Sequence, residues 1–286
     1  MIELIGAICC SAVLFLIFRL FPRFHVDTAQ AIVFNYFTAF ACGSLISEQT
    51  PSVSGLIASG LTPWILLCGF LFISIFIAMG ISSQKNGMGT TSVAVKMSLA
   101  LSALAFVFIH HEAVTWLKVL GFIAAIAGVL MITLEKSNGD KIENSYLLLA
   151  FIFFGSAGLD VVLNLIKQFF AQGYPDSLFT AFGFLAAGTL GIIWLTLQYV
   201  QRKKSFHFRN ILAGIILGVP NYFSIYFLVR SYDSTPWSNA TVLAIMNISI
   251  VSLAAILGML IFKESTKMQK WMGLLLAIGA ILCLTS

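Results

Sequence analysis

The stretch "TTSVAVKMSLALSALAFVF", residues 90–108, decides the class of fold. It is long enough to cross the hydrocarbon core of a bilayer as one helix, since a spanning helix needs about 20 mostly apolar residues. Lys96 is the one charged residue in this run. A lysine at the centre of a membrane helix costs about 2.5–3.5 kcal/mol on insertion scales, so we expect it to have a partner or a function.

The composition of the chain favours the same class. Of the 286 residues, 59% are hydrophobic and 9% are charged, whereas about 25% are charged in soluble domains. The charged residues stand in short clusters between apolar runs, which is typical of a multi-pass membrane protein. The net charge of +5 therefore does not indicate nucleic-acid binding. The five cysteines lie in apolar runs without a CxxC pair, so we expect neither a disulfide framework nor a metal site.

Hydropathy predicts an all-α membrane protein with ten transmembrane helices. The polar segment "EKSNGDKIEN" separates five expected helices from five. We expect a first five-helix repeat over 1–134, a connecting loop over 135–144 and a second five-helix repeat over 145–286. The ten expected spans are 3–20, 29–47, 62–83, 90–109, 115–133, 145–168, 177–200, 210–231, 237–262 and 267–285.

The two halves resemble each other most clearly at their ends. The segment "HHEAVTWLKVLGFIAAIAGVLMI" (110–132) aligns with "FKESTKMQKWMGLLLAIGAILCL" (262–284), which pairs Glu112 with Glu264. Each glutamate stands where a helix stops, so we interpret both as turn and cap residues. Small residues at three- and four-residue spacing on both segments predict that the last helices of the halves pack together. Since five spans is an odd number, the second copy enters the membrane from the opposite side, which predicts inverted repeats.

The loop charges predict an orientation. The loops after the first, third, fifth, seventh and ninth spans hold twelve lysines and arginines, and the loops on the other side hold three. The positive-inside rule places the twelve in the cytoplasm and both termini outside. We therefore expect a multi-pass protein of the cell (inner) membrane.

With these two helix–loop–helix ends, the chain resembles the ten-helix EamA-type permeases of the drug/metabolite transporter superfamily. The segments that carry the likeness are "FVFIHHEAVTWLKVLGFIAAIAGVLMI" and "ILGMLIFKESTKMQKWMGLLLAIGAIL". The resemblance covers essentially the whole chain and implies a secondary transporter, but it leaves the substrate open because that superfamily moves many kinds of metabolite. Many relatives have a proline inside the fourth and ninth helices, and this chain has none there, so that hinge is not carried over.

Polar residues inside the expected spans provide candidates for a substrate site. The helix over 145–168 places Ser156, Asp160, Asn164 and Lys167 at steps of four, four and three, which puts them on one face. Lipid would penalise such a face, so we expect it to point toward protein or water. Asp160 is too far from the helix ends to reach the headgroups. It is therefore either part of a buried ion pair or a carboxylate that takes up a proton.

The helix over 210–231 carries Pro220 near its middle. A proline inside a helix frees a backbone carbonyl, which favours a bend and an exposed acceptor. Polar and aromatic side chains follow it, and they either line a cavity or belong to packing and interfacial belts. The candidate substrate-binding residues outside the helix of Asp160 are Lys96, Asn35, Tyr36, Asn221, Tyr222, Tyr226 and Asn247.

Lys96 is the centre of the hypothesis. Its helical neighbours Ser92 and Ala100 are small, and small faces pack against protein. We expect a midplane site in which Lys96 attracts a carboxylate or phosphate, with Asp160 as counter-ion when the site is empty. Two alternatives remain open: Lys96 extends to the cytoplasmic edge of the membrane, or Asp160 takes a proton and couples transport to a gradient.

These features predict a secondary transporter that moves a small polar metabolite, anionic or zwitterionic such as an amino acid, by alternating access. The expected partners are this small molecule and membrane lipids, with no cofactor and no nucleic acid, and the chain is a monomer or homodimer. The alternative is a flippase for a lipid or lipid-linked phosphate, since Lys96 would bind either phosphate. The chain is not expected to be an enzyme, because no second polar cluster accompanies the sequence His110-His111-Glu112.

Overall fold

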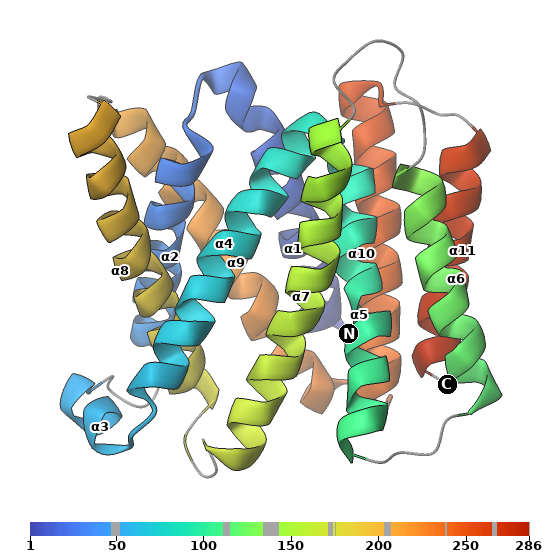
Figure 1. Cartoon of the computed structure of the whole chain (residues 1–286), viewed down its shortest axis with the longest axis horizontal. Coiled ribbons are helices and arrows are strands. Elements are labelled where there is room, and N and C mark those ends of the chain that lie inside the picture. The colour runs from blue at the N-terminus through green and yellow to red at the C-terminus, as the bar shows by residue number, and fades with distance from the viewer. Residues whose placement is uncertain are drawn as a thin grey trace. The chain divides into compact units, whose positions relative to one another are not determined.

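The computed structural model describes residues 1–46, 52–110, 115–133, 143–170, 174, 176–202, 207–237, 239–264 and 268–285. These residues form helices joined by short connections and contain no strand (Figure 1). The elements are α1 (Ile2–Leu20), the 3-10 helix η1 (Phe21–Phe24), α2 (Thr28–Ile46), α3 (Val53–Ala58), α4 (Thr62–Lys85), α5 (Met88–His110), α6 (Trp116–Thr133), α7 (Glu143–Phe169), α8 (Asp176–Arg202), α9 (Phe208–Ser234), α10 (Asn239–Phe262) and α11 (Met268–Thr285).

A helix lies at each of the ten expected ranges, with ends that differ from the prediction by a few residues. Two short elements, η1 and α3, were not predicted. In α3 the Ser52 hydroxyl accepts a hydrogen bond from the Gly55 N–H and so caps the helix. A helix of six residues is too short to stand out in a hydropathy window, which is why it was not predicted.

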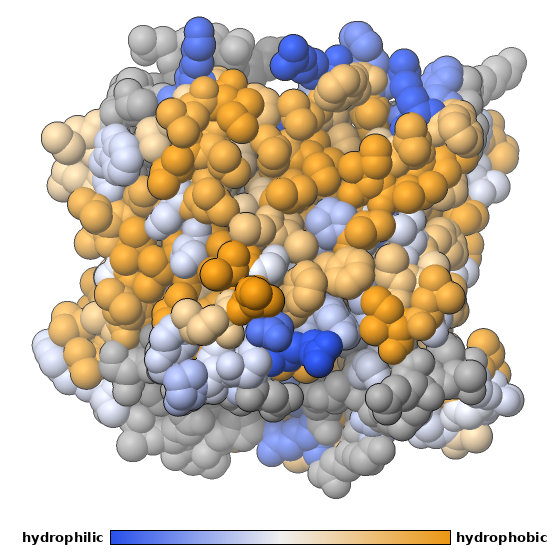
Figure 2. Space-filling view, turned by 180° about the vertical axis from the view of Figure 1, so that it is seen from behind, coloured by the Kyte–Doolittle hydropathy of each residue, from blue (hydrophilic) through white to orange (hydrophobic). Residues whose placement is uncertain are grey.

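Seven helical segments are long and apolar enough to cross a membrane, by length and composition of the described residues. Apolar side chains occupy the middle of the face drawn in Figure 2, and most of the coloured hydrophilic ones lie toward its upper and lower edges. The prediction of an all-helical protein is therefore confirmed for the described residues, and seven of their helical segments could cross a membrane. The seven segments are Ile2–Phe24, Thr28–Ile46, Thr62–Lys85, Tyr146–Ile166, Ser177–Val200, Phe208–Tyr232 and Ile245–Phe262.

The chain divides into two compact units, and each unit takes segments from both halves of the sequence. Unit 1 consists of Met1–Arg19, Ala78–Val161 and Phe223–Ser286, and unit 2 consists of Leu20–Ile77 and Val162–Tyr222. The units therefore differ from the expected repeats over 1–134 and 145–286. Those repeats stay a prediction about the sequence, and most of the connecting loop over 135–144 lies outside the described residues.

Close packing of α6 against α11 forms much of the core of unit 1. A Cβ on Gly128 of α6 would lie 3.1 Å from the Gly273 carbonyl oxygen and 3.2 Å from the Ala277 nitrogen, so the two backbones approach each other at this point. Ala125, Ala277 and Ala280 are fully buried nearby in the same cluster. The predicted packing of the last helices of the two halves is therefore confirmed.

Unit 2 contains two more close helix contacts, both made by α2. Its partner α8 places Gly191 against Val33. Its partner α9 places Gly214 and Gly218 so close that an added Cβ would lie 2.5 Å from the Ala31 carbonyl oxygen and 2.6 Å from that of Asn35. Two glycines four residues apart allow such an approach between membrane helices. The GIILG pattern over 214–218 is the sequence signal of this contact.

Candidate functional site

Lys96 on α5 and Asp160 on α7 both belong to unit 1. Each influences the other electrostatically, but their nitrogen and oxygen atoms are not within the 4.0 Å of a direct ion pair, because no described ion pair joins them. The Ser102 hydroxyl of α5 donates a hydrogen bond to the Asp160 carboxylate over 3.4 Å. The expected amine and carboxylate are therefore near each other, but they do not form a direct ion pair.

The two faces of α7 differ in what they expose. Leu147, Phe151 and Phe154 are exposed on one face, as expected of side chains that meet lipid. At 3.6 residues per turn, Asp160 lies on the opposite face, which also carries the buried Ile152. Asp160 is nevertheless exposed. An exposed carboxylate on this face agrees with the expectation that the face points toward water rather than lipid.

Ser156 precedes Asp160 by one turn on the same face of α7. Its side chain is buried, and its hydroxyl oxygen has no hydrogen-bond partner among the described residues. An unsatisfied polar group in an apolar environment costs free energy, so such a group indicates a water molecule or a ligand. Lys96, Ser102, Ser156 and Asp160 together offer a cation, an acceptor and hydroxyls that both donate and accept.

Two further predicted residues, Tyr226 on α9 and Asn247 on α10, belong to unit 1. The Tyr226 hydroxyl accepts a hydrogen bond of 2.9 Å from Arg230, whose guanidinium also lies 5.6 Å from the centre of the tyrosine ring. Asn247 is buried. Whether either residue contacts a substrate stays a prediction.

The other five predicted residues lie in unit 2. The Tyr36 hydroxyl donates a 2.8 Å hydrogen bond to the Phe72 carbonyl, so this group already serves the packing of α2 against α4. Asn35 is fully buried, and both polar atoms of its amide are without a partner among the described residues. Asn164 is exposed, Asn221 is buried and the ring of Tyr222 lies against Gly43.

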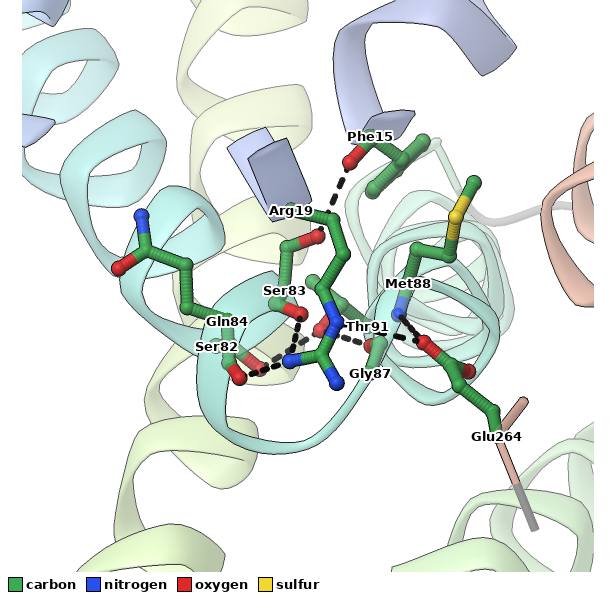
Figure 3. A network of polar contacts seen from close by, with 9 residues as sticks. All are labelled: Phe15, Arg19, Ser82, Ser83, Gln84, Gly87, Met88, Thr91 and Glu264. Atoms are coloured by element: carbon green, nitrogen blue, oxygen red, sulfur yellow. Dashed lines mark hydrogen bonds and ion pairs between the residues drawn. The ribbon is translucent and has the colours of Figure 1, made fainter. Parts of the chain in front are cut away.

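A second polar cluster in unit 1 is centred on Glu264, which follows α10 (Figure 3). Its side chain is 5% exposed. One carboxylate oxygen accepts a 2.8 Å hydrogen bond from the N–H of Met88 at the start of α5, and the same oxygen lies 3.8 Å from Nε of Arg19. Glu264 therefore caps α5, far away in sequence, where the positive end of the helix dipole favours a carboxylate. The sequence predicted a local turn or cap and missed this partner.

Arg19 completes the cluster from the end of α1. Its guanidinium donates hydrogen bonds to the carbonyls of Ser83 (3.3 Å) and Gln84 at the end of α4. Gly87 has a φ of 90°, and a Cβ there would lie 2.6 Å from the Glu264 carboxylate. The cluster joins the ends of α1, α4 and α10 to the start of the helix that carries Lys96.

The fold and the two clusters define an α-helical membrane protein with charged groups among its apolar helices. No family model matches the sequence. An uncharacterised protein of Haemophilus influenzae is 32% identical over 292 residues, which cover 99% of this chain and 97% of that protein. The chain therefore belongs to the same family as this relative. A protein of known crystal structure shares the fold with a TM-score of 0.57 and 15% identity, over 98% of both chains.

Proposed function

We propose that the protein is a secondary transporter, an EamA-type permease of the drug/metabolite transporter superfamily, that moves a small anionic or zwitterionic metabolite by alternating access. The observation that carries the proposal is the group formed by Lys96, Ser156 and Asp160 in unit 1. A separated cation and carboxylate and an unpaired hydroxyl are costly among membrane helices unless a ligand or water uses them. The accessible position of Asp160 on the protein-facing side of α7 supports a path to this group.

The packing of equivalent helices supports ten spans in two inverted repeats. The three most extensively packed pairs are α6 with α11, α5 with α10 and α2 with α8. In the expected repeats these are the fifth, fourth and second helices of each half. A pair of two-fold related repeats produces contacts of this kind near its axis. With five helices per repeat the second is inverted, which allows one site to open alternately to the two sides.

In this mechanism Lys96 binds the carboxylate or phosphate of the solute. The Asp160 carboxylate balances Lys96 in the empty site and accepts the hydrogen bond from Ser102. When the anion of the solute approaches Lys96, Asp160 becomes available for an ammonium group of the solute or for a proton. Proton uptake at Asp160 would couple the transport to a gradient. The loop charges support a cell-membrane protein with both termini outside.

Counterflow in proteoliposomes tests the proposal. The panel consists of labelled amino acids, organic acids and a labelled phospholipid, and the variant is Lys96→Gln. We expect the variant to lose at least tenfold in counterflow of the solute that the wild type accepts, because a buried charge-assisted contact is removed. Lys85→Gln, at the exposed end of α4, is the matched control and should transport normally. Unchanged transport by Lys96→Gln excludes Lys96 from the site, and movement of the phospholipid alone favours the flippase.

A further inference from the structure

Unit 2 contains a pocket of about 210 Å³ between the start of α2 and the last third of α8. A polar site needs about 10–15 Å³ of such space to hold one water molecule, so this pocket has room for a group of several atoms. Its lining combines a carboxylate, two amides, two aromatic rings and two aliphatic side chains. The lining residues are Asp27, Ala29, Gln30, Trp194, Leu195, Gln198 and Tyr199.

The carboxylate of the pocket is held in place by α2 and α9. Asp27 Oδ1 accepts a 3.1 Å hydrogen bond from the Gln30 N–H, and the Asp27 N–H donates to Asn210 Oδ1 over 3.0 Å. The Asn210 amide in turn donates to Gln30 Oε1 over 2.6 Å, and both of these amide side chains are buried. The acidic group therefore enters the pocket from a rigid support, which reduces the entropy lost on binding.

The chemistry of this lining matches an ammonium group. Tyr199 is close enough to Asp27 to feel its charge, and Trp194 lies on the same wall with 40% of its surface exposed. A carboxylate beside aromatic rings attracts ammonium ions through charge and through the ring quadrupole. None of the described lining residues is cationic.

The place of the pocket along the helices points to a lipid headgroup. Asp27 stands directly before α2, and Tyr199 stands three residues before the end of α8. Helix ends of this kind lie at the headgroup level, where tryptophan and tyrosine are common. Two exposed arginines stand near this cluster in the sequence, Arg209 directly before Asn210 and Arg23 four residues before Asp27. Cations of this kind attract a phosphate.

We propose that this pocket binds the zwitterionic headgroup of phosphatidylethanolamine, with the ammonium on Asp27 and against Trp194. None of the lining residues belongs to the group of Lys96, Ser156 and Asp160. It makes the protein sensitive to the headgroup composition of its membrane.

Binding of short-chain lipids to the purified full-length protein tests this proposal. Dihexanoyl phosphatidylethanolamine is titrated against the protein in detergent, with dihexanoyl phosphatidylglycerol and free ethanolamine as separate arms. The readouts are the thermal shift and the dissociation constant. We expect phosphatidylethanolamine to raise the melting temperature, and Asp27→Asn to weaken its binding about tenfold or more, as when a charge-assisted hydrogen bond is lost.

Two further variants distinguish a loss of the binding site from a folding defect and from a general effect of removing a tryptophan. Trp194→Leu should also weaken the binding of phosphatidylethanolamine. Trp237→Leu, at a tryptophan of similar exposure in unit 1, should leave this binding unchanged. Equal binding of phosphatidylethanolamine to wild type, Asp27→Asn and Trp194→Leu would overturn the proposal. Equal stabilisation by phosphatidylglycerol would overturn it as well, and so would a response to free ethanolamine as strong as that to the lipid.

Discussion

Replacement of Glu264 by alanine tests whether the cluster of Figure 3 holds the helix ends together. The change removes the acceptor of the Met88 N–H, and a hydrogen bond to a charged group contributes about 1.5–3 kcal/mol. It also removes the ion pair to Arg19, whose side chain is 26% exposed, so this part is screened and contributes about 0–1 kcal/mol. We expect Glu264→Ala to lower the free energy of unfolding by about 1.5–4 kcal/mol.

Glu264→Gln separates the two contributions. Glutamine keeps a carbonyl oxygen for the Met88 N–H and loses the charge, so we expect a loss of about 1 kcal/mol. The measurement is equilibrium unfolding in mixed micelles titrated with denaturing detergent. Glu3→Gln, at a partly exposed acidic side chain, is the control. Glutamine can still accept the hydrogen bond from the Ser234 hydroxyl, so this change should alter the free energy by less than about 0.5 kcal/mol.

A double-mutant cycle with Arg19→Gln completes this experiment. If Arg19 and Glu264 interact as the structure describes, the two changes should show a coupling energy of about 0.5–1 kcal/mol. The reasoning is refuted if Glu264→Ala unfolds like the wild type, or if Glu264→Gln is as destabilising as Glu264→Ala. The second result would mean that the carboxylate charge, and not the acceptor for α5, carries the effect.

Four further substitutions give distinct outcomes. Gly128→Ala should destabilise the protein by about 1–3 kcal/mol because the new Cβ meets the backbone of α11. The Cβ of Gly279→Ala meets no atom, so this change should stabilise the protein by about 1 kcal/mol. Equal effects of the two changes would contradict the close packing of α6 against α11. Asn35→Leu should raise the free energy of unfolding by about 1–3 kcal/mol by removing an unpaired amide, and a decrease would reveal a partner. Ser156→Ala should leave stability unchanged or higher but raise the KM for counterflow several-fold, and an unchanged KM would remove Ser156 from the site.

The positions of the helices could be predicted from the sequence to within a few residues. An apolar segment in a membrane must satisfy its own backbone hydrogen bonds, so a run of spanning length forms a helix whatever its neighbours are. The stripe of Ser156, Asp160 and Asn164 on one face of α7 follows from the same periodicity. The close contact of α6 with α11 could be read from its small residues for a similar reason.

Partners across the fold could not be predicted in this way. Glu264 reads as a local cap because it ends a helix, yet its carboxylate accepts from the N–H of Met88. Tyr36 reads as a residue of a polar cavity, whereas its hydroxyl binds the Phe72 carbonyl. The division into units could not be predicted from the sequence either, because α4, α7 and α9 each pass from one unit to the other.

By itself the sequence determined the class of this protein, the places of its helices and the side chains that are costly in a bilayer, because these depend on hydropathy and on the period of a helix. The tertiary structure alone decided which polar groups come together: Asp160 with the Ser102 hydroxyl and near Lys96, Glu264 with Arg19 and α5, and Asp27 with Asn210. These pairings depend on how helices distant in sequence pack, and no local pattern records that packing.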